Sequence, residues 1–321
     1  MSAYLDSFRQ CFFIPKPTLT EKNLPNQSGR VFIVTGGYAG VGKELCKILY
    51  QHNGTVYVAG RSQSKADAAI EEIKKAYPSS DGRLEFLHVD LADLSTIKKS
   101  VEDFTAREQR LDVLTNNAGV MTPPVGSITS QSHELQLGTN VLGPWLFTTL
   151  LTPLLAKTAS ASPAGSVRVT WAASLATMFS PRNGLAWAAD GSKPKTHGDR
   201  ATDYAQSKAA NVLLAREYAA RHGKSVGVVS NAWNPGNLAS ELQRHSSAVE
   251  RFIIGFLVYP PIFGGYTELF AGWSEEAGRK ENDGRYVVPW GRFGVLRADL
   301  EASKEGEKLW EWCERESKPF M

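Results

Sequence analysis

Short β-branched runs alternate with longer stretches of helical periodicity along most of this chain, and this alternation constrains the fold more than any other feature. The short runs are apolar throughout, as strands buried inside a parallel sheet are, and they lie at residues 31–35, 55–59, 84–89, 111–115, 167–171 and 226–230. The helical stretches between them lie at residues 42–52, 65–77, 94–107, 133–156 and 203–222. Such alternation produces right-handed βαβ crossovers. The sequence therefore predicts an α/β fold with a doubly wound, mainly parallel sheet and helices on both faces.

Residues 1–321 are predicted to form a single domain, because no segment of the alternating region has the composition of a linker. Residues 1–28 precede the first strand as an N-terminal extension. Two segments that follow strand ends, 175–203 and 238–263, are predicted to cover a bound substrate. Two further elements are expected near the C-terminus, a strand at the sheet edge and an amphipathic packing helix, at residues 285–288 and 309–313.

Composition argues against several classes of function. The 36 lysine and arginine residues nearly balance the 33 acidic residues, and a net charge of +3 provides no basic face for nucleic acid. Neither the 3 scattered cysteines nor the 6 histidines have the spacing of metal ligands. We therefore expect no metal site and no disulfide framework. Cysteine usage of this kind is typical of a reducing compartment, so we expect a cytoplasmic protein.

Two apolar segments bear on membrane insertion. Residues 141–156 form the most apolar internal run, but they contain two prolines and fall short of the roughly 20 residues that span a bilayer. Residues 252–263 are interrupted by a glycine and two prolines. We therefore expect no transmembrane segment, although these patches and a short one at residues 11–14 leave a looser membrane association open.

A glycine-rich turn directly follows the first predicted strand and opens the first predicted helix. Its glycines have the spacing G-x3-G-x-G rather than the commoner G-x-G-x-x-G fingerprint. Glycines at such a place let the chain turn tightly and let phosphates approach the N–H groups of a helix start. The alternative is that they only form a turn. The sequence predicts a pyrophosphate site made by Gly36, Tyr38, Ala39, Gly40, Val41 and Gly42.

The end of the second strand predicts which dinucleotide is bound. An enzyme that selects NAD usually carries an acid here, which accepts a hydrogen bond from the ribose 2′-hydroxyl. No aspartate or glutamate occurs between Gly54 and Ala66, and Arg61 carries the charge that suits a 2′-phosphate. We therefore expect NADP (NADPH) as the cofactor. The alternative is that Arg61 is a solvated surface charge.

Two later strand ends add predicted cofactor contacts. Asp90, followed by Leu91, ends the third strand, where its carboxylate is placed to hydrogen-bond an adenine amino group. The fourth strand leads into small residues that permit a close approach to the cofactor, namely Asn117, Ala118 and Gly119. A purely structural role is the alternative for both.

Tyr204 and Lys208 are four residues apart on a predicted helix, so they share one face and the ammonium lies near the phenol. This spacing is common by chance and gains meaning from Asn140 and from Ser174 at the fifth strand end. The chain resembles the short-chain dehydrogenase/reductase family over nearly its whole length, through these four residues, the turn at 35–42, Asp90, residues 116–119 and the pair Pro235-Gly236. The retinol-dehydrogenase-like and fungal secondary-metabolism members are the most similar, at residues 111–121, 204–217 and 261–272.

The resemblance implies a single-domain Rossmann fold and hydride transfer between a nicotinamide and a carbonyl carbon. It implies that Tyr204 is the acid/base and that Lys208 lowers the pKa of that tyrosine and contacts the ribose. It implies that Ser174 holds the substrate oxygen and that Asn140 anchors a water-linked proton relay. Tyr204 and Lys208 thereby also count as cofactor contacts, and the late loop is implied to contact the nicotinamide through Pro235, Gly236 and Leu238.

Two positions depart from the family pattern. Ala173 stands where a second serine is usual, which leaves Ser174 without a close substitute. Asn237 stands where a threonine usually follows the glycine of the late loop.

The segments predicted to cover the substrate are rich in large apolar side chains: Met178, Phe179, Trp187, Leu242, Phe252, Ile253, Phe256, Leu257, Ile262 and Phe263. A covering of this kind favours a bulky hydrophobic or aromatic ketone or aldehyde, or the matching secondary alcohol. With the fungal resemblance, the leading expectation is a tailoring reductase of secondary metabolism. The alternatives are a retinoid, steroid or lipid alcohol dehydrogenase, a catalyst of a non-redox step, and an NADP-sensing scaffold. The sequence leaves monomer and homodimer open.

Overall fold

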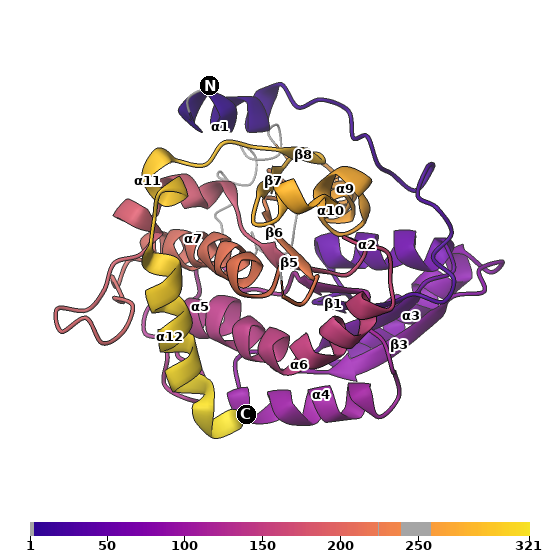
Figure 1. Ribbon diagram of the computed structural model, residues 1–321, viewed down its shortest axis with the longest axis horizontal. Coiled ribbons are helices and arrows are strands. Elements are labelled where there is room, and N and C mark those ends of the chain that lie inside the picture. The colour runs from indigo at the N-terminus through magenta and orange to yellow at the C-terminus, as the bar shows by residue number, and fades with distance from the viewer. Residues whose placement is uncertain (1–2, 224, 239–257) are drawn as a thin grey trace.

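A computed structural model of the chain describes residues 3–223, 225–238 and 258–321. Within these residues, eight strands form one sheet in the order β3-β2-β1-β4-β5-β6-β7-β8 (Figure 1). Neighbouring strands are parallel from β3 to β7, and β8 is antiparallel to β7. The strands are β1 (Val31–Thr35), β2 (Thr55–Gly60), β3 (Arg83–His88), β4 (Val113–Asn116), β5 (Arg168–Ala172), β6 (Val229–Trp233), β7 (Tyr286–Val288) and β8 (Arg292–Phe293). The predicted single α/β domain with a doubly wound, mainly parallel sheet is confirmed.

Helices cover both faces of this sheet, because successive residues of a buried strand point to opposite sides. In β1, Phe32 and Val34 pack into one apolar core and Val31 and Ile33 into the other. The first core is closed by α2 (Gly40–Gln51), α3 (Gln63–Ala76) and α9 (Pro261–Trp273). The second is closed by α4 (Ile97–Thr105), α6 (Gly143–Ser160) and α7 (Arg200–Tyr218).

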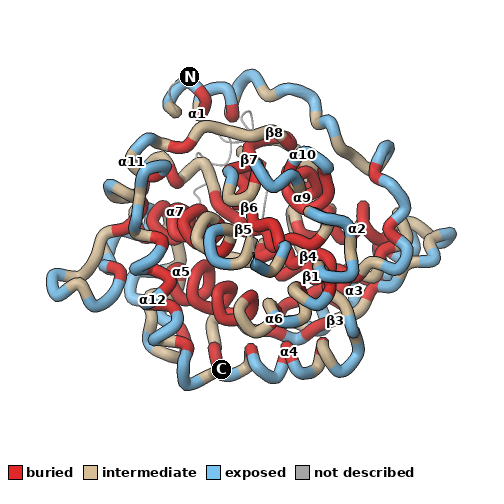
Figure 2. Tube along the Cα trace, viewed as in Figure 1, coloured by how far each residue is buried: buried red, intermediate tan, exposed pale blue. Residues whose placement is uncertain are grey.

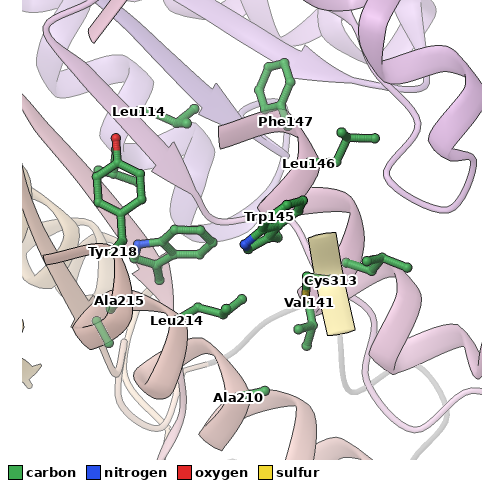
Figure 3. Close-up of a cluster of buried hydrophobic side chains, with 14 of the residues drawn as sticks. Leu114, Val141, Trp145, Leu146, Phe147, Ala210, Leu214, Ala215, Tyr218 and Cys313 are labelled. Carbon is green, nitrogen blue, oxygen red and sulfur yellow. The ribbon is translucent and has the colours of Figure 1, made fainter. Parts of the chain in front are cut away.

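Aromatic residues join the second core to the C-terminal helix α12 (Glu305–Ser317). Figure 3 shows Trp145 of α6 beside Leu214 and Tyr218 of α7, with Cys313 nearby. The ring centroids of Trp145 and Trp310 of α12 are 5.3 Å apart. The amphipathic packing helix predicted at residues 309–313 is therefore confirmed. Figure 2 shows the buried residues gathered on the sheet and on the inner sides of the helices around it.

Short helical segments complete the chain. They are α1 (Ala3–Phe12), α5 (Leu135–Leu137), α10 (Glu275–Gly278) and α11 (Ala298–Glu301), with single turns at Leu94–Thr96, Gly138–Leu142, Leu175–Phe179, Arg182–Gly184, Ala219–Gly223, Lys280–Asn282 and Lys318–Phe320. Helix α1 lies inside the extension expected at residues 1–28, which the sequence pattern did not resolve into elements. Among the described residues, no helix is both long and apolar enough to cross a bilayer.

The predicted strand at residues 226–230 begins too early, and this boundary is corrected by the structure. The N–H of Val226 donates to the carbonyl of His222 at 2.8 Å, and Gly227 has a φ of +75°. These residues therefore still belong to the turn that leaves α7, and β6 begins at Val229. The other predicted strands overlap observed ones; the strand at residues 31–35 has the predicted bounds, and the remaining boundaries differ by at most two residues.

Candidate active site

The predicted site residues gather at one edge of the sheet, where the parallel strands have their carboxyl ends. Gly36 follows β1, Arg61 follows β2 and Asp90 lies just beyond β3. Residues 117–119 follow β4, Ser174 lies just beyond β5, and Pro235-Gly236 lies beyond β6. The strand order reverses between β1 and β4, which is the switch point where ligands of doubly wound folds bind.

The glycine turn packs tightly on one side and is open on the other. Gly36 and Gly40 have φ angles of +69° and +53°, the left-handed region that glycine adopts without strain. A Cβ on Gly42 would lie 2.5 Å from the side-chain nitrogen of Asn117, so Gly42 is required by packing within the protein. A Cβ on Gly40 would meet nothing within 4 Å. No side chain caps the start of α2, so the N–H groups of its first turn remain available to an anion.

Hydrogen bonds between the ends of β1 and β4 fix the floor of this turn. The hydroxyl of Thr35 accepts from the backbone N–H groups of Asn117 and Ala118, both at 3.0 Å. The side-chain amide of Asn117 donates to the carbonyl of Thr35 at 2.7 Å. The Asn117 side chain therefore joins two strands in addition to any role in cofactor binding.

At the end of β2, Arg61 is exposed and has no hydrogen bond or ion pair with another described residue. The ring of Tyr38 lies over Gly60, where a Cβ would clash with it. An acidic side chain at position 60, as in an NAD-selective site, would thus require Tyr38 to move. Lys43, a second cation beside the turn, is already paired with Glu72 at 2.6 Å.

Asp90 and Leu91 have local structural partners at the end of β3. One carboxylate oxygen of Asp90 accepts from the N–H of Ala92 at 3.0 Å. Leu91 is buried, and a Cβ on Gly143 of α6 would clash with its carbonyl oxygen. The second oxygen of the Asp90 carboxylate has no hydrogen-bond partner in the described part of the chain and can accept from a ligand.

Helix α7 carries Tyr204 and Lys208 on the face turned toward the end of β5. The carboxylate of Asp199 caps this helix by accepting from the N–H of Thr202 at 2.9 Å, which fixes where the helix begins. The ammonium of Lys208 lies 5.7 Å from the centroid of the Tyr204 ring. It also donates to the carbonyl of Ala172 at 3.0 Å. The predicted pair is therefore brought together.

Ser174 and Asn140 complete the group. The side chain of Ser174 lies near the phenol of Tyr204, and its hydroxyl oxygen accepts from the N–H of Ala176 at 3.1 Å. Asn140 lies in a π-helical turn between α5 and α6, an irregularity that often occurs at functional sites. A Cβ on Gly119 would lie 2.9 Å from Asn140 Oδ1 and 3.3 Å from Lys208 Nζ. Gly119 therefore lets these two side chains approach the same point.

The Asn140 side chain is held by three protein contacts. Its oxygen accepts from the N–H of Val120 at 2.7 Å. Its nitrogen donates to the carbonyl of Val120 at 2.9 Å and to the hydroxyl of Ser207 at 3.0 Å. This arrangement fixes the amide rigidly and ties the β4 loop to α7.

The protein packed around the two titratable groups shifts both pKa values toward the neutral forms. Desolvation raises the pKa of Tyr204 to about 12, although the nearby side chain of Ser174 acts in the opposite direction. Burial lowers the pKa of Lys208 to about 8. The resemblance implied that Lys208 lowers the pKa of Tyr204, whereas in the protein alone desolvation raises this pKa and the opposing contribution comes from Ser174. At neutral pH Tyr204 therefore holds its proton and Lys208 is mostly charged.

Three residues around the site were missed by the sequence analysis. Ser207 holds Asn140, and Asn211 donates to the carbonyl of Ala172 at 2.8 Å, the same oxygen that binds Lys208. Tyr286 of β7 donates its hydroxyl proton to the carbonyl of Ser174 at 3.1 Å. Ser207 and Asn211 follow Tyr204 and Lys208 at intervals of three, and this shared helix face was the available signal. No sequence signal indicated Tyr286, because its contact with Ser174 depends on the order of the strands in the sheet.

The late loop is joined to the N-terminal helix. Gly236 has a φ of +88°, and its N–H donates to the side chain of Asn234 at 3.1 Å. The Asn234 amide in turn donates to the side chain of Gln10 at 2.8 Å. Leu238 is buried and forms a parallel bridge with Tyr259. The loop that carries Pro235 is thus held in place from outside the sheet.

The apolar residues predicted to cover the substrate have different surroundings. A narrow space beside the segment after Ser174 is lined by Met178 and by Ser7, Gln10, Leu175, Thr177, Tyr286, Val295 and Leu296. Phe179 is exposed. The indole of Trp187 donates to Glu305 at 2.7 Å, so this residue helps to dock α12. Ile262 and Phe263 belong to α9, where Ile262 packs against the first core and Phe263 against Trp290. Leu242, Phe252, Ile253, Phe256 and Leu257 lie outside the described residues.

Known proteins match this chain over most of its length. The family model for short chain dehydrogenases matches residues 30–170. A short-chain dehydrogenase/reductase of Phomopsis amygdali is 48% identical over 323 residues, which is 96% of each chain. The short-chain dehydrogenase/reductase pkfC of Emericella nidulans is 45% identical and covers 95% of this chain and 98% of its own length.

Solved structures of other proteins have a fold similar to that of this chain. An uncharacterised protein from Mycobacterium paratuberculosis has a TM-score of 0.68 and 25% identity, covering 94% of this chain and 97% of its own. The RhlG/NADP complex of Pseudomonas aeruginosa has a TM-score of 0.53 and 25% identity, covering 68% of this chain and 76% of its own. With the near full-length fungal relatives, these matches place the chain in the short-chain dehydrogenase/reductase family.

Proposed function

We propose that this oxidoreductase uses NADPH to reduce a bulky hydrophobic or aromatic ketone or aldehyde, as a tailoring step of fungal secondary metabolism. The observation that carries the proposal is the placement of the Tyr204 ring 5.7 Å from the buried ammonium of Lys208, with Ser174 near its phenol. A phenol with a pKa of about 12 gives its proton only to a strong base. The alkoxide that forms when a carbonyl is reduced is such a base.

Each side chain then has a distinct role. The hydroxyl of Ser174 donates a hydrogen bond to the carbonyl oxygen and stabilises the negative charge that develops there. Tyr204 transfers its phenolic proton to that oxygen, and the charge of Lys208 stabilises the phenolate that remains. Asn140 keeps the β4 loop against α7, so that Lys208 stays in place. The nicotinamide, when bound, supplies the hydride to the carbonyl carbon.

The residues present suit a dinucleotide. The open side of Gly40, the uncapped first turn of α2 and the free oxygen of Asp90 offer contacts to pyrophosphate and adenine. For the choice of NADP, the support is the exposed Arg61, which has no partner among the described residues, together with Tyr38, whose ring fills the space an acid would need. The Pseudomonas neighbour described as an NADP complex is consistent with this choice.

The substrate class rests on the large apolar side chains of the two segments predicted to cover the substrate. Leu175, Met178 and Leu296 border the narrow space beside the segment after Ser174. Segments 175–203 and 238–263 are proposed to cover a substrate that is bulky and hydrophobic. The three free cysteines fit a cytoplasmic location.

A substrate panel tests the proposal. The purified protein is incubated with aromatic and alicyclic ketones and with NADPH or NADH, and turnover is followed through the nicotinamide absorbance. We expect turnover with at least one bulky ketone and faster turnover with NADPH. Turnover that appears only with alcohols and oxidised cofactor would instead indicate an alcohol dehydrogenase. A complete lack of turnover with cofactor binding intact would favour the sensing scaffold.

A further inference from the structure

The N-terminal helix α1 is amphipathic in the reverse sense, with polar residues facing the protein and apolar residues facing outward. Asp6 and Gln10 are 1% and 3% exposed. The apolar side chains on the outer side are 46% to 73% exposed, and they are Tyr4, Leu5, Phe8, Phe12 and the adjacent Phe13. We call these five residues the α1 apolar face. Figure 2 shows α1 at the periphery of the molecule, with mainly exposed residues and the buried ones on its inner side.

The polar side of α1 is firmly bound to the protein. The carboxylate of Asp6 accepts from the N–H of Val295 at 2.9 Å and from the side chain of Gln10 at 3.0 Å. Gln10 accepts from Asn234, beside the late loop of the active site, at 2.8 Å. Because these buried polar groups satisfy one another, rotating the helix to bury its aromatic side would leave them unpaired. The outward orientation of the apolar face is therefore built into the fold.

The C-terminal helix α12 shows the ordinary arrangement. It buries Leu309, Trp310 and Trp312 and exposes its charged residues. Both helices lie outside the layers that cover the sheet, yet only α12 hides its apolar side (Figure 1). Leaving four aromatic rings exposed near one another is unfavourable in water, so a surface that covers them would be a natural partner. Two of these rings, Phe8 and Phe12, are in contact at 4.9 Å between centroids.

The charges around this face indicate the kind of surface. Arg9, Lys16 and Lys22 are exposed, whereas Asp6, the acid of α1, is buried. Glu21, the next acid along the chain, accepts a hydrogen bond from Tyr266 at 2.7 Å. The segment therefore presents aromatic rings next to cations, the combination that binds the interface of an anionic bilayer.

The size of the face also favours lipid over a second copy of the chain. Five partly exposed side chains offer on the order of 500 Å² if each large side chain provides about 200 Å². A stable protein interface needs about 800 Å² from each partner. Binding to a membrane does not require a complementary protein surface of this area.

We propose that the α1 apolar face docks this protein on an anionic membrane surface. Tyr4, Leu5, Phe8, Phe12 and Phe13 enter the interfacial region, and Lys16 and Lys22 contact lipid phosphates. Helix α1, with 10 residues, lies on the membrane surface. Since Gln10 ties α1 to the loop before Pro235, docking turns the reaction edge of the sheet toward the lipid. The inference concerns a surface and stands whether or not the proposed reductase reaction is correct.

Vesicle sedimentation tests the proposal with the full chain. The wild-type protein is incubated with vesicles of phosphatidylcholine alone and with vesicles that also contain phosphatidylserine. We expect binding to the anionic vesicles that weakens with salt. Phe8→Ser with Phe12→Ser should reduce the partition coefficient at least tenfold. Lys16→Glu should reduce it roughly fivefold or more. The matched control is Met321→Ser, an apolar residue that is 40% exposed at the C-terminus, on the opposite side of the molecule from α1 (Figure 1), and that should leave binding unchanged.

Folding is monitored by circular dichroism, and a second pair, Tyr4→Ser with Phe13→Ser, repeats the test if the first pair fails to fold. The proposal is overturned if the wild type binds no vesicles, or if the variants bind as well as it does. It is also overturned if the wild type forms a dimer that Phe8→Ser with Phe12→Ser converts to a monomer while vesicle binding is absent. That result would make the face an interface between copies of the chain.

Discussion

The two halves of the proposed binding groove are built in different ways. The cofactor half, at the ends of β1 and β2, consists of glycines, backbone N–H groups and the exposed Arg61. The catalytic half, at the ends of β4 and β5, consists of side chains that hydrogen bonds hold in place, from Asn140 to Lys208. The cofactor half leaves room for a ligand beside its backbone, whereas the catalytic half holds reactive side chains in fixed positions. Changes in the cofactor half should therefore alter binding and selectivity, and changes in the catalytic half should alter turnover.

The largest effect is expected for Tyr204→Phe, which keeps the ring and removes the phenolic proton. Turnover should fall by roughly 10²–10⁴-fold, the usual cost of losing a general acid. Cofactor affinity, measured by fluorescence titration, should remain nearly unchanged. Tyr218→Phe is the matched control, because Tyr218 lies on the same helix and bonds to Thr152 rather than to the site. Near-normal turnover of Tyr204→Phe would mean that another group supplies the proton.

Arg61→Ala should have the next largest effect and should act on selectivity alone. A charge-assisted hydrogen bond of about 1.5–3 kcal/mol to the 2′-phosphate corresponds to a preference of roughly 10- to 150-fold for NADPH. The variant should lose most of this preference and should use NADH almost as before. The measurement is the ratio of kcat/KM for the two cofactors.

Lys65→Ala is the control for this prediction, since Lys65 is an exposed cation in the first turn of α3. Equal kcat/KM values for NADPH and NADH in the unmodified protein would show that Arg61 is a solvated charge. A larger effect of Lys65→Ala than of Arg61→Ala would assign the phosphate contact to α3.

The pH dependence of reduction should come from the catalytic half. Burial holds the pKa of Lys208 at about 8, so this residue loses its charge as the pH rises through that value. Tyr204, with a pKa of about 12, still keeps its proton there. The kcat/KM for reduction should therefore decline by about tenfold for each pH unit above 8. A profile that stays flat to pH 10 would show that the charge of Lys208 is dispensable.

The smallest expected effect concerns a buried carboxyl beneath the cofactor half. Glu268 of α9 is fully buried, and neither of its carboxyl oxygens has a hydrogen-bond partner among the described residues. Burial raises the pKa of Glu268 well above its usual value, so the folded protein holds a proton that the unfolded chain releases above about pH 4.5. Stability associated with this group is present below that pH and is lost as the pH rises.

Glu268→Met keeps a similar volume and removes the buried acid. It should raise the free energy of unfolding by roughly 1–3 kcal/mol, the usual cost of an unpaired buried polar group. The gain should be larger at pH 8 than at pH 5, as measured by urea denaturation. A variant that is less stable than the wild type at both pH values would mean that the carboxyl has a stabilising partner.

The two halves of the groove also differ in how well the sequence predicted them. The glycine turn and Arg61 are local signals, because a strand, a turn and a helix that are adjacent in sequence make up that half. Tyr204, Lys208 and Ser174 were identified through the family resemblance rather than through spacing alone, and the structure brings them together. The contacts of Ser207, Asn211 and Tyr286 were not predicted. They depend on which strands neighbour one another, and periodicity does not carry that information.

The orientation of helix α1 could likewise not be predicted from its local sequence pattern. Its sequence has the period of an amphipathic helix, but the rule that apolar residues face inward would have oriented it the wrong way. Its orientation is decided by Asp6 and Gln10, which bond to residues 295 and 234. Partners so distant in sequence cannot be read from a local pattern.

Transfer of isotope from the cofactor tests the central claim most directly. The protein is incubated with a bulky aromatic ketone and NADPH deuterated at the transferring position of the nicotinamide, and the product is analysed by mass spectrometry. We predict an alcohol with one deuterium on the carbinol carbon from the wild type and from Tyr218→Phe, and only a small fraction of that amount from Tyr204→Phe. A product that forms without deuterium and without consumption of NADPH would contradict the account, because the site would then catalyse a non-redox step.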